Sequence, residues 1–275
     1  MNRNIKQKLF LCGAAAFAAL FLFSGIMLVR QVADQKQSAE AFEQVAGLVQ
    51  EEPEQPSLFP VEPDTTAETA PPITAYEKYA AVYEQNNDFV GWISIDGTKI
   101  NYPVMQSPDN ADFYLKHAFD KSYSDYGTPY VQENCILDSS DNLVIYGHHM
   151  KDGSMFAGLC SYADEDFYQD HKTIHFDTLA GFGEYEVVAA FKTVVYSQEG
   201  FKYYHFIDAE CEEDFDEFIA ECKALALYDT GVTAEYGDKL ITLSTCEYSR
   251  TNGRMVVVAK LITPSAEEVD ADAGY

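Results

Sequence analysis

Residues 241–262, "ITLSTCEYSRTNGRMVVVAKLI", constrain the fold more than any other stretch of the chain. Two runs rich in β-branched residues flank a short polar segment with Asn252-Gly253, the pattern of two β-strands joined by a turn. If the hairpin turns near Arg250, then Cys246 and Arg254 are cross-strand partners with β-carbons about 5 Å apart. The pattern therefore predicts a thiol beside a guanidinium, which can stabilise a thiolate or an oxyanion.

A buried structural cysteine beside a surface arginine would have the same pattern, so the hairpin alone leaves both interpretations open. A thiol nucleophile needs an imidazole, and "NLVIYGHHM" offers His148 directly after a predicted strand and Gly147. A zinc site of His148, His149 and a cysteine would lack a fourth ligand at suitable spacing. His149 is predicted to be a satisfied structural residue. The remaining histidines lie in polar loop or helix contexts and are also predicted to be structural: His117, His171, His175 and His205.

The region from Thr74 onwards contains many short predicted strands. "FVGWISIDGTKINYPVMQ" alternates apolar and polar residues around Asp96-Gly97, and "CILDSSDNLVIYGHHM" predicts another pair of strands. "YEVVAAFKTVVYS" predicts one long strand. Because few helices accompany these strands, the pattern favours a closed or nearly closed β-barrel.

Two helices are predicted in the same region. "TAYEKYAAVYEQN" is predicted to be a helix with Thr74 as its N-cap. Its expected apolar face consists of Tyr76, Tyr79, Ala80 and Tyr83. "EEDFDEFIAECKALALY" has acids near its start and apolar residues at helical spacing, with Cys222 on the apolar face. This second helix is predicted as an insertion between strands.

An apolar run from Leu9 to Val29 dominates the N-terminal region, and Ser24 is its only polar residue. At about 1.5 Å per residue in a helix, the run spans about 30 Å, the thickness of a hydrocarbon core. Cations before the run and few after it predict a single-pass anchor over residues 9–29, with residues 1–8 in the cytoplasm and the rest outside the cell. A cleaved signal peptide is the alternative, although its apolar region would be shorter.

Residues 30–73 predict a juxtamembrane helix followed by an extended tether. Six of the ten prolines fall in "EEPEQPSLFPVEPDTTAETAPPI", a proline-rich and acidic composition that builds no core. A globular domain over residues 74–264 and an acidic tail over residues 265–275 complete the predicted organisation. The net charge of −27 argues against nucleic acid as a partner. Five cysteines lie outside the apolar run, an odd number, and no disulfide framework is predicted.

Three segments, in this order, resemble class B sortases, the cell-surface cysteine transpeptidases of Gram-positive bacteria. They are "GWISIDGTKINYPVMQSPDNADFYLKHAFD", "NLVIYGHHMKDGSMFAGL" and "ITLSTCEYSRTNGRMVVVAKL", and they cover most of residues 75–262. The resemblance implies a mainly β fold, an eight-stranded sortase-type β-barrel with N-terminal helices and a helix inserted before the cysteine strand. It makes residues 74–264 the catalytic domain, and the anchor and tether match the family's membrane topology.

The resemblance also implies roles for individual residues. Cys246 would be the nucleophile, His148 the general acid and base, and Arg254 the group that stabilises the oxyanion or the substrate. A substrate groove is implied at five matching positions: Tyr146, Ser244, Glu247, Asn110 and Leu115. The match is looser at Asn110 and Leu115. Ser244 shares the strand face of Cys246, and it has simple packing as an alternative role.

The implied reaction is transpeptidation at the C-terminal sorting signal of a secreted protein. A thioacyl-enzyme would form, and an amine of a peptidoglycan precursor of the lipid II type would resolve it. The resemblance implies no metal and no cofactor, and the predicted location is the cell membrane with an extracellular catalytic domain.

Three other functions stay open on the sequence. A pilin-polymerising sortase would use a lysine side chain as the acceptor amine. A secreted cysteine peptidase would use water, and it usually needs an Asn or Asp to orient the histidine. A catalytically inactive, membrane-tethered binding module would leave a buried Cys246 resistant to alkylation.

Overall fold

The computed structural model describes residues 3–50, 73–196 and 200–262. The chain divides into two compact units, Met1–Glu43 and Gln44–Tyr275, and each is described separately. The predicted tether and the acidic tail lie outside the described residues.

The first unit is helical and belongs to α1, a helix over Arg3–Ala46 that also runs into the second unit. Large apolar side chains between Phe10 and Val32 are exposed. Among the described residues, the segment Phe10–Ala46 is the one helix that is long and apolar enough to cross a membrane, with a mean hydropathy of 2.2 over its most apolar window. The predicted juxtamembrane helix is a continuation of this same helix.

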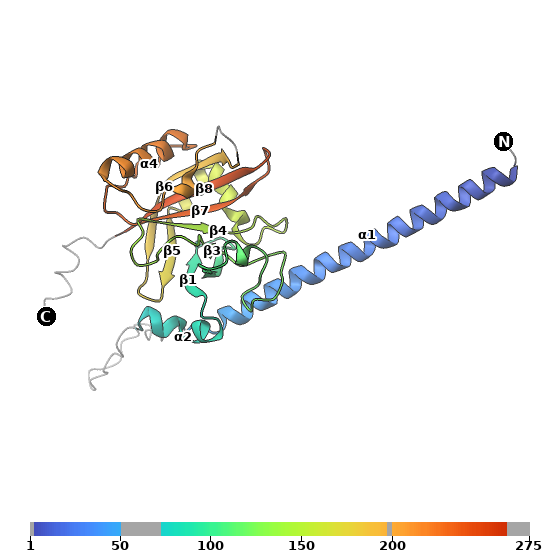
Figure 1. Cartoon of the computed structure of the whole chain (residues 1–275), viewed down its shortest axis with the longest axis horizontal. Helices are drawn as coiled ribbons and strands as arrows, with labels where there is room; N and C mark the ends of the chain where they lie inside the picture. Colours follow the sequence, from blue (N-terminus) through green and yellow to red (C-terminus); the bar gives the residue numbers. More distant parts are fainter. Residues whose placement is uncertain (1–2, 51–72, 197–199, 263–275) are drawn as a thin grey trace, which may run out of the picture. The chain divides into compact units, whose positions relative to one another are not determined.

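Eight strands of the second unit close into a β-barrel (Figure 1). They are β1 Phe89–Ser94, β2 Asn101–Met105, β3 Tyr130–Val131, β4 Asn142–Tyr146, β5 Thr173–Thr178, β6 Glu184–Val194, β7 Leu240–Glu247 and β8 Gly253–Leu261. The order around the barrel is β1-β2-β3-β4-β7-β8-β6-β5, and β5 pairs with β1 to close it. The eight-stranded barrel expected from the resemblance is confirmed.

Two of the barrel's neighbouring pairs are parallel, β2 with β3 and β4 with β7. The hairpin of β7 and β8 is antiparallel, and Cys246 is paired with Arg254 in the predicted register. Val256, Val257 and Val258 on β8 are fully buried, as expected for a β-branched run inside a barrel. The predicted turn between β1 and β2 is also present, with Gly97 at a φ of 73°, a conformation that favours glycine.

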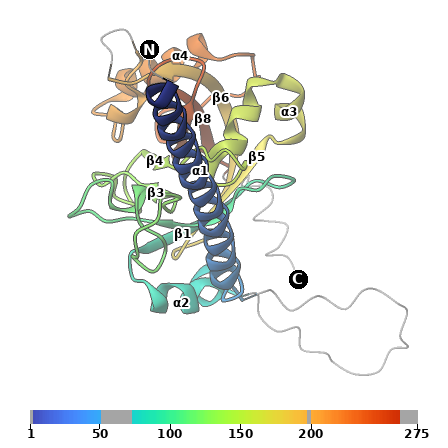
Figure 2. The same ribbon diagram turned by 90° about the vertical axis from the view of Figure 1, so that its right-hand side faces the viewer.

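Besides α1, the described helices lie before β1 or between the strands in the sequence. They are α2 Ala75–Gln85, α3 Glu165–Asp170 and α4 Glu212–Leu225, with short 3₁₀ helices η1 Phe113–Leu115, η2 Phe156–Ala163 and η3 Tyr203–His205. Thr74 caps α2 as predicted, because its hydroxyl accepts from the Glu77 amide while the Glu77 carboxylate accepts from the Thr74 amide. The predicted insertion before the cysteine strand is α4, which buries Cys222 and lies beside β6 in both views (Figure 1 and Figure 2).

Three local predictions are wrong. The segment 135–141 is a turn and not a strand. The Ser140 hydroxyl accepts from the Ile136 amide, and the Ser140 amide donates to the Ile136 carbonyl, so the backbone turns back on itself. His175, predicted in a polar loop or helix, lies instead on strand β5. Alternate residues of this strand are buried, and the polar residues between them give the segment the composition of a loop. The buried face of α2 is rotated: Tyr76 is exposed, and Val82 is buried instead.

Candidate active site

A cleft of about 500 Å³ opens where β4 and β7 end and β8 begins. Because β4 and β7 are parallel, their C-terminal ends lie at the same edge of the barrel, and the antiparallel β8 starts at that edge. This arrangement brings Cys246, His148 and Arg254 to the wall of one cleft. Three residues predicted from two separate segments therefore lie together.

Cys246 is half-buried near the end of β7, directly opposite Arg254 on β8. Cross-strand partners place their side chains on the same face, so the guanidinium is a neighbour of the thiol. The terminal Nη1 of the Arg254 guanidinium donates to the Gly253 carbonyl at 3.0 Å, which ties the guanidinium to the backbone. The cation is thus held at the rim of the site where negative charge would develop on a thiolate or an oxyanion.

The imidazole of His148 is held by the neighbouring η1 element. Its Nε2 lies 2.7 Å from the Leu115 carbonyl oxygen, and since a carbonyl only accepts, Nε2 carries a proton. Burial lowers the pKa of His148 below its ordinary value, and the Leu115 hydrogen bond opposes this shift. At neutral pH the ring is therefore neutral, with Nδ1 unprotonated and able to accept a proton.

Gly147 precedes His148 because no larger residue fits there. A β-carbon at this position would lie 2.5 Å from the Cγ of Phe156, which is fully buried on η2. The backbone therefore passes against the Phe156 ring, and the Phe156 amide donates to the His148 carbonyl at 2.8 Å. Close packing with η2 thus fixes the backbone that carries the imidazole.

Several tyrosines are among the residues that line the cleft, and their hydroxyls supply polar groups along its wall. The Tyr203 and Ser244 hydroxyls are 2.6 Å apart and both residues are buried, while Tyr146 donates to the Gln132 side-chain oxygen at 2.5 Å. Burial raises the pKa of Tyr203 to about 12, so this phenol stays protonated at neutral pH. A peptide that entered the cleft would meet hydroxyl donors and acceptors beside the thiol.

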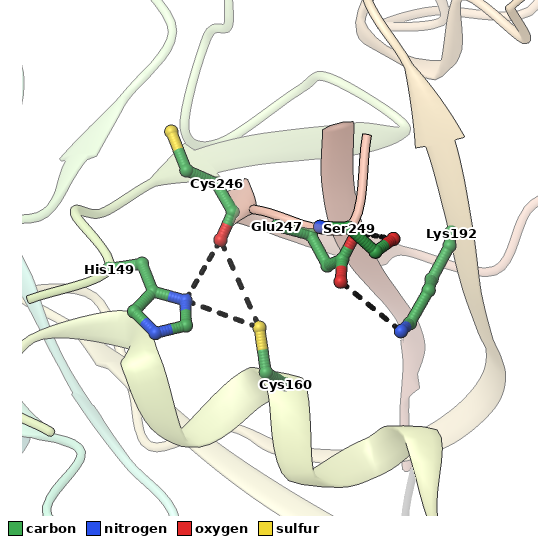
Figure 3. A network of polar contacts seen from close by, with 6 residues as sticks. All are labelled: His149, Cys160, Lys192, Cys246, Glu247 and Ser249. Carbon is green, nitrogen blue, oxygen red and sulfur yellow. Dashed lines mark hydrogen bonds and ion pairs between the residues drawn. The ribbon is translucent and has the colours of Figure 1, made fainter. Parts of the chain in front are cut away.

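The five residues that the resemblance assigned to a substrate groove divide into two sets. Tyr146, Ser244 and Leu115 line the cleft. Asn110 is an exposed residue ahead of η1 and is not among the residues that line the cleft. Glu247 is also outside this lining, since its carboxylate accepts from Ser249 and pairs with Lys192 at 3.3 Å (Figure 3).

Other lining residues were not found from the sequence. They are Asp112, Tyr130, Gln132, Glu133, Val195, Tyr196, Tyr203, Tyr204, His205 and Thr245, together with the Gly147 backbone. Tyr203 and Ser244 are 41 positions apart, and neither segment carries a pattern that predicts their contact. The aromatic residues of "KYYH" at 202–205 are a local sign of a buried segment. They do not distinguish a wall of the cleft from an ordinary buried loop.

The backbone of Cys246 has a second set of neighbours, away from the cleft. The carbonyl of Cys246 lies 2.9 Å from Nδ1 of His149, and the Cys160 sulfur lies 3.3 Å from the same nitrogen. In Figure 3 the Cys246 sulfur points away from both residues. His149, predicted to be a satisfied structural residue, therefore contacts the backbone of the candidate nucleophile.

Comparisons of the sequence with known proteins identify the family. The family model of the Sortase domain matches residues 93–262. Sortase B of Staphylococcus aureus (strain NCTC 8325 / PS 47) is 36% identical over 191 residues, which cover 68% of this chain and 76% of that protein. Sortase B of Listeria monocytogenes serovar 1/2a (strain ATCC BAA-679 / EGD-e) is 37% identical over 185 residues, 65% of this chain and 71% of that protein.

Solved structures lead to the same family. The Staphylococcus aureus sortase B-substrate complex matches with a TM-score of 0.62 and 34% identity, over 68% of this chain and 86% of that one. Sortase B from B. anthracis in complex with AAEK1 matches with a TM-score of 0.67 and 28% identity, over 84% of this chain and 99% of that one. The chain belongs to the sortase family of transpeptidases, and within it to class B.

Proposed function

We propose that this chain is a membrane-anchored cysteine transpeptidase that cleaves a C-terminal sorting signal of secreted proteins and joins them to a peptidoglycan amine. The observation that carries the proposal is the meeting of Cys246, His148 and Arg254 at one cleft. A thiol, a neutral imidazole and a cation supply the nucleophile, the base and the oxyanion stabilisation for acyl transfer through a thioester.

The first half of the reaction forms the thioacyl-enzyme. His148 accepts the thiol proton of Cys246 at Nδ1, and the thiolate attacks the carbonyl carbon of the scissile peptide bond. The carbonyl oxygen becomes an oxyanion, which Arg254 stabilises. As the tetrahedral intermediate collapses, the imidazolium gives its proton to the leaving amine, and the C–N bond breaks.

The second half transfers the acyl group to a new amine. An amine of a peptidoglycan precursor of the lipid II type attacks the thioester carbon, and His148 now accepts the proton of the attacking nitrogen. The C–S bond breaks and the thiol of Cys246 is restored. Water in place of the amine would give hydrolysis, so slow proteolysis is an expected side reaction.

The apolar part of α1 supports a membrane location for the enzyme. The chain is proposed to cross the membrane once, with residues 1–8 in the cytoplasm and the catalytic domain over residues 74–264 outside the cell. Cations ahead of the apolar run support this orientation. Secreted proteins and wall precursors meet on that side, so substrate and acceptor would both reach the cleft.

The proposal is tested with the full chain in detergent micelles and a library of fluorogenic sorting-signal peptides. Each peptide is incubated with and without an amine, using hydroxylamine as a general thioester trap and wall-type amines as candidate acceptors. Cys246→Ala is the inactive variant, and Cys211→Ala is the matched control because Cys211 is an exposed thiol at the start of α4. Cleavage that is lost only in Cys246→Ala, with ligated product when amine is present, is the expected result.

Other outcomes identify the alternatives. Cleavage at a rate and with products that ignore every amine would indicate a cysteine peptidase. Ligation to a lysine-containing pilin peptide and to no wall-type amine would indicate a pilin-polymerising sortase. Absence of cleavage for every peptide, together with a Cys246 that resists alkylation, would leave a binding module.

A further inference from the structure

We propose that His149 is a positioning residue for acyl transfer: its imidazole holds the backbone carbonyl of Cys246 and thereby fixes the direction of the thiol. The inference rests on the proposed function for its kinetic consequence. Nδ1 of His149 lies 2.9 Å from the carbonyl oxygen of Cys246 (Figure 3). Because that oxygen only accepts, Nδ1 carries the proton in this contact.

The carbonyl of Cys246 lies on the side of β7 that faces β4, at a position beyond the end of β4. The last pair of β4 and β7 joins Tyr146 and Ser244, and the Gly147 amide still donates to the Ser244 carbonyl at 3.2 Å. Carbonyls two residues apart on a strand point to the same side, so the next donor of a continued ladder would be the backbone N–H of His149, aimed at Cys246. The imidazole of that same residue supplies the N–H instead.

The η2 helix adds a neighbour to the contact between His149 and the Cys246 carbonyl. The Cys160 sulfur, on η2, lies 3.3 Å from Nδ1 of His149 and 3.9 Å from the Cys246 carbonyl oxygen. Burial raises the pKa of Cys160 to about 11, so this sulfur is a neutral thiol at neutral pH. The ring of Tyr248 meets the imidazole edge-on at 5.0 Å, and its hydroxyl donates to the His149 carbonyl at 3.2 Å. The imidazole is thus held by groups from η2 and from the β7–β8 loop.

The position of this contact gives it a consequence for the chemistry. The peptide unit after Cys246 joins the last two residues of β7, and without the imidazole its carbonyl would keep only the longer contact with the Cys160 sulfur at 3.9 Å, which leaves this end of the strand freer to rotate. Such rotation moves the thiol relative to His148 and Arg254, and misplacement of a reacting group by about 1 Å can cost about 100-fold in rate. Loss of the anchor should therefore lower kcat and leave KM nearly unchanged.

The test compares three variants of the full chain in detergent micelles, with the best peptide and amine from the screen above. His149→Ala removes the donor, and His149→Asn replaces it with an amide N–H near the same place. His171→Ala is the matched control, because Nδ1 of the half-buried His171 also contacts a backbone carbonyl, that of Phe167, at 2.7 Å and outside the cleft. We expect His149→Ala to lower kcat about tenfold with KM within about twofold, His149→Asn to recover most of the loss, and His171→Ala to change kcat less than about twofold.

A second measurement needs neither substrate nor a folded variant. Nitrogen-15 NMR of wild-type chain labelled at histidine should assign His149 as the Nδ1–H tautomer, and an Nε2–H tautomer would overturn the inference. It would also be overturned by a His149→Ala enzyme with wild-type kcat, or by His149→Asn that stays as slow as His149→Ala at an unchanged melting temperature. If the wild type cleaves no peptide, the proposed function fails, whereas the tautomer still decides whether the anchor exists.

Discussion

The imidazole of His148 is neutral and holds its proton on one particular nitrogen, and each property has its own cause. Burial lowers the pKa of the ring, and the Leu115 carbonyl requires the proton on Nε2. Of the charges around the ring, Lys116 lowers this pKa further and Asp125 raises it. The base that would start the reaction is therefore present at rest, and its strength depends on two surface charges.

Removal of Lys116 and removal of Asp125 should shift the pKa of His148 in opposite directions. Lys116→Ala removes a cation that opposes protonation and should raise the pKa, while Asp125→Asn removes an anion that favours protonation and should lower it. Both side chains are largely exposed, so shifts of a fraction of a pH unit are expected at low salt, and added salt should erase them. The acid limb of kcat/KM and NMR titration of His148 measure both shifts, and shifts of equal sign would contradict the assignment.

Arg254 should contribute through the charge and the shape of its guanidinium. Arg254→Ala should lower kcat/KM by about 100- to 1,000-fold, the range for loss of one oxyanion donor, and Arg254→Lys should recover only part because its ammonium lacks the planar fork. Arg250→Ala is the control, since Arg250 is exposed in the same hairpin loop and should change kcat/KM less than about twofold. Equal losses for the two alanine variants would contradict a specific role for Arg254.

At the scale of elements, the packing of η2 against the end of β4 determines where His148 sits. The β-carbon of alanine at position 147 would approach the Phe156 ring at a point where the ring cannot swing aside, because Phe156 is fully buried. Gly147→Ala should therefore lower the free energy of unfolding by about 1–3 kcal/mol and reduce activity together with it. Thermal melting and peptide cleavage measure the two effects, and Gly147→Ala with Phe156→Leu should regain part of both if the clash is the cause.

Some elements were predictable from the sequence and others were not, for physical reasons. The register of β7 and β8 follows from the loop with Asn252-Gly253, because a short turn leaves a single pairing for Cys246 and Arg254. Strand β3 spans two residues, too few for any periodicity, and β5 carries polar residues that conceal its alternation. Likewise, the contact of Tyr203 with Ser244 depends on where the β6–β7 connection folds back.

At the scale of the whole molecule, the thiols report separately on the fold and on the site. Cys135 and Cys222 are buried, and burial raises the pKa of both thiols, that of Cys135 to about 11. Iodoacetamide at neutral pH should therefore label the half-buried Cys246 in the native chain and leave both core thiols unlabelled until the barrel unfolds. Peptide mapping by mass spectrometry reads each site, and native labelling of Cys222 before Cys246 would contradict this burial.

The parallel pairing of β4 with β7 fixes the spacing of His148 and Cys246 independently of the loop that forms part of the cleft wall. Residues 147 and 245 are 98 positions apart in the sequence, yet a hydrogen bond of 2.8 Å joins them at the edge of the cleft. Within that stretch, β5 and β6 belong to the barrel and η2 holds the backbone of His148, whereas the connection between β6 and β7 contains η3 with its Tyr203 and lines the cleft. Insertions or deletions in the β6–β7 connection can reshape the wall that a peptide meets without changing the spacing of His148 and Cys246. New substrate preferences could therefore be engineered there, by loop replacement, with the acyl-transfer chemistry kept.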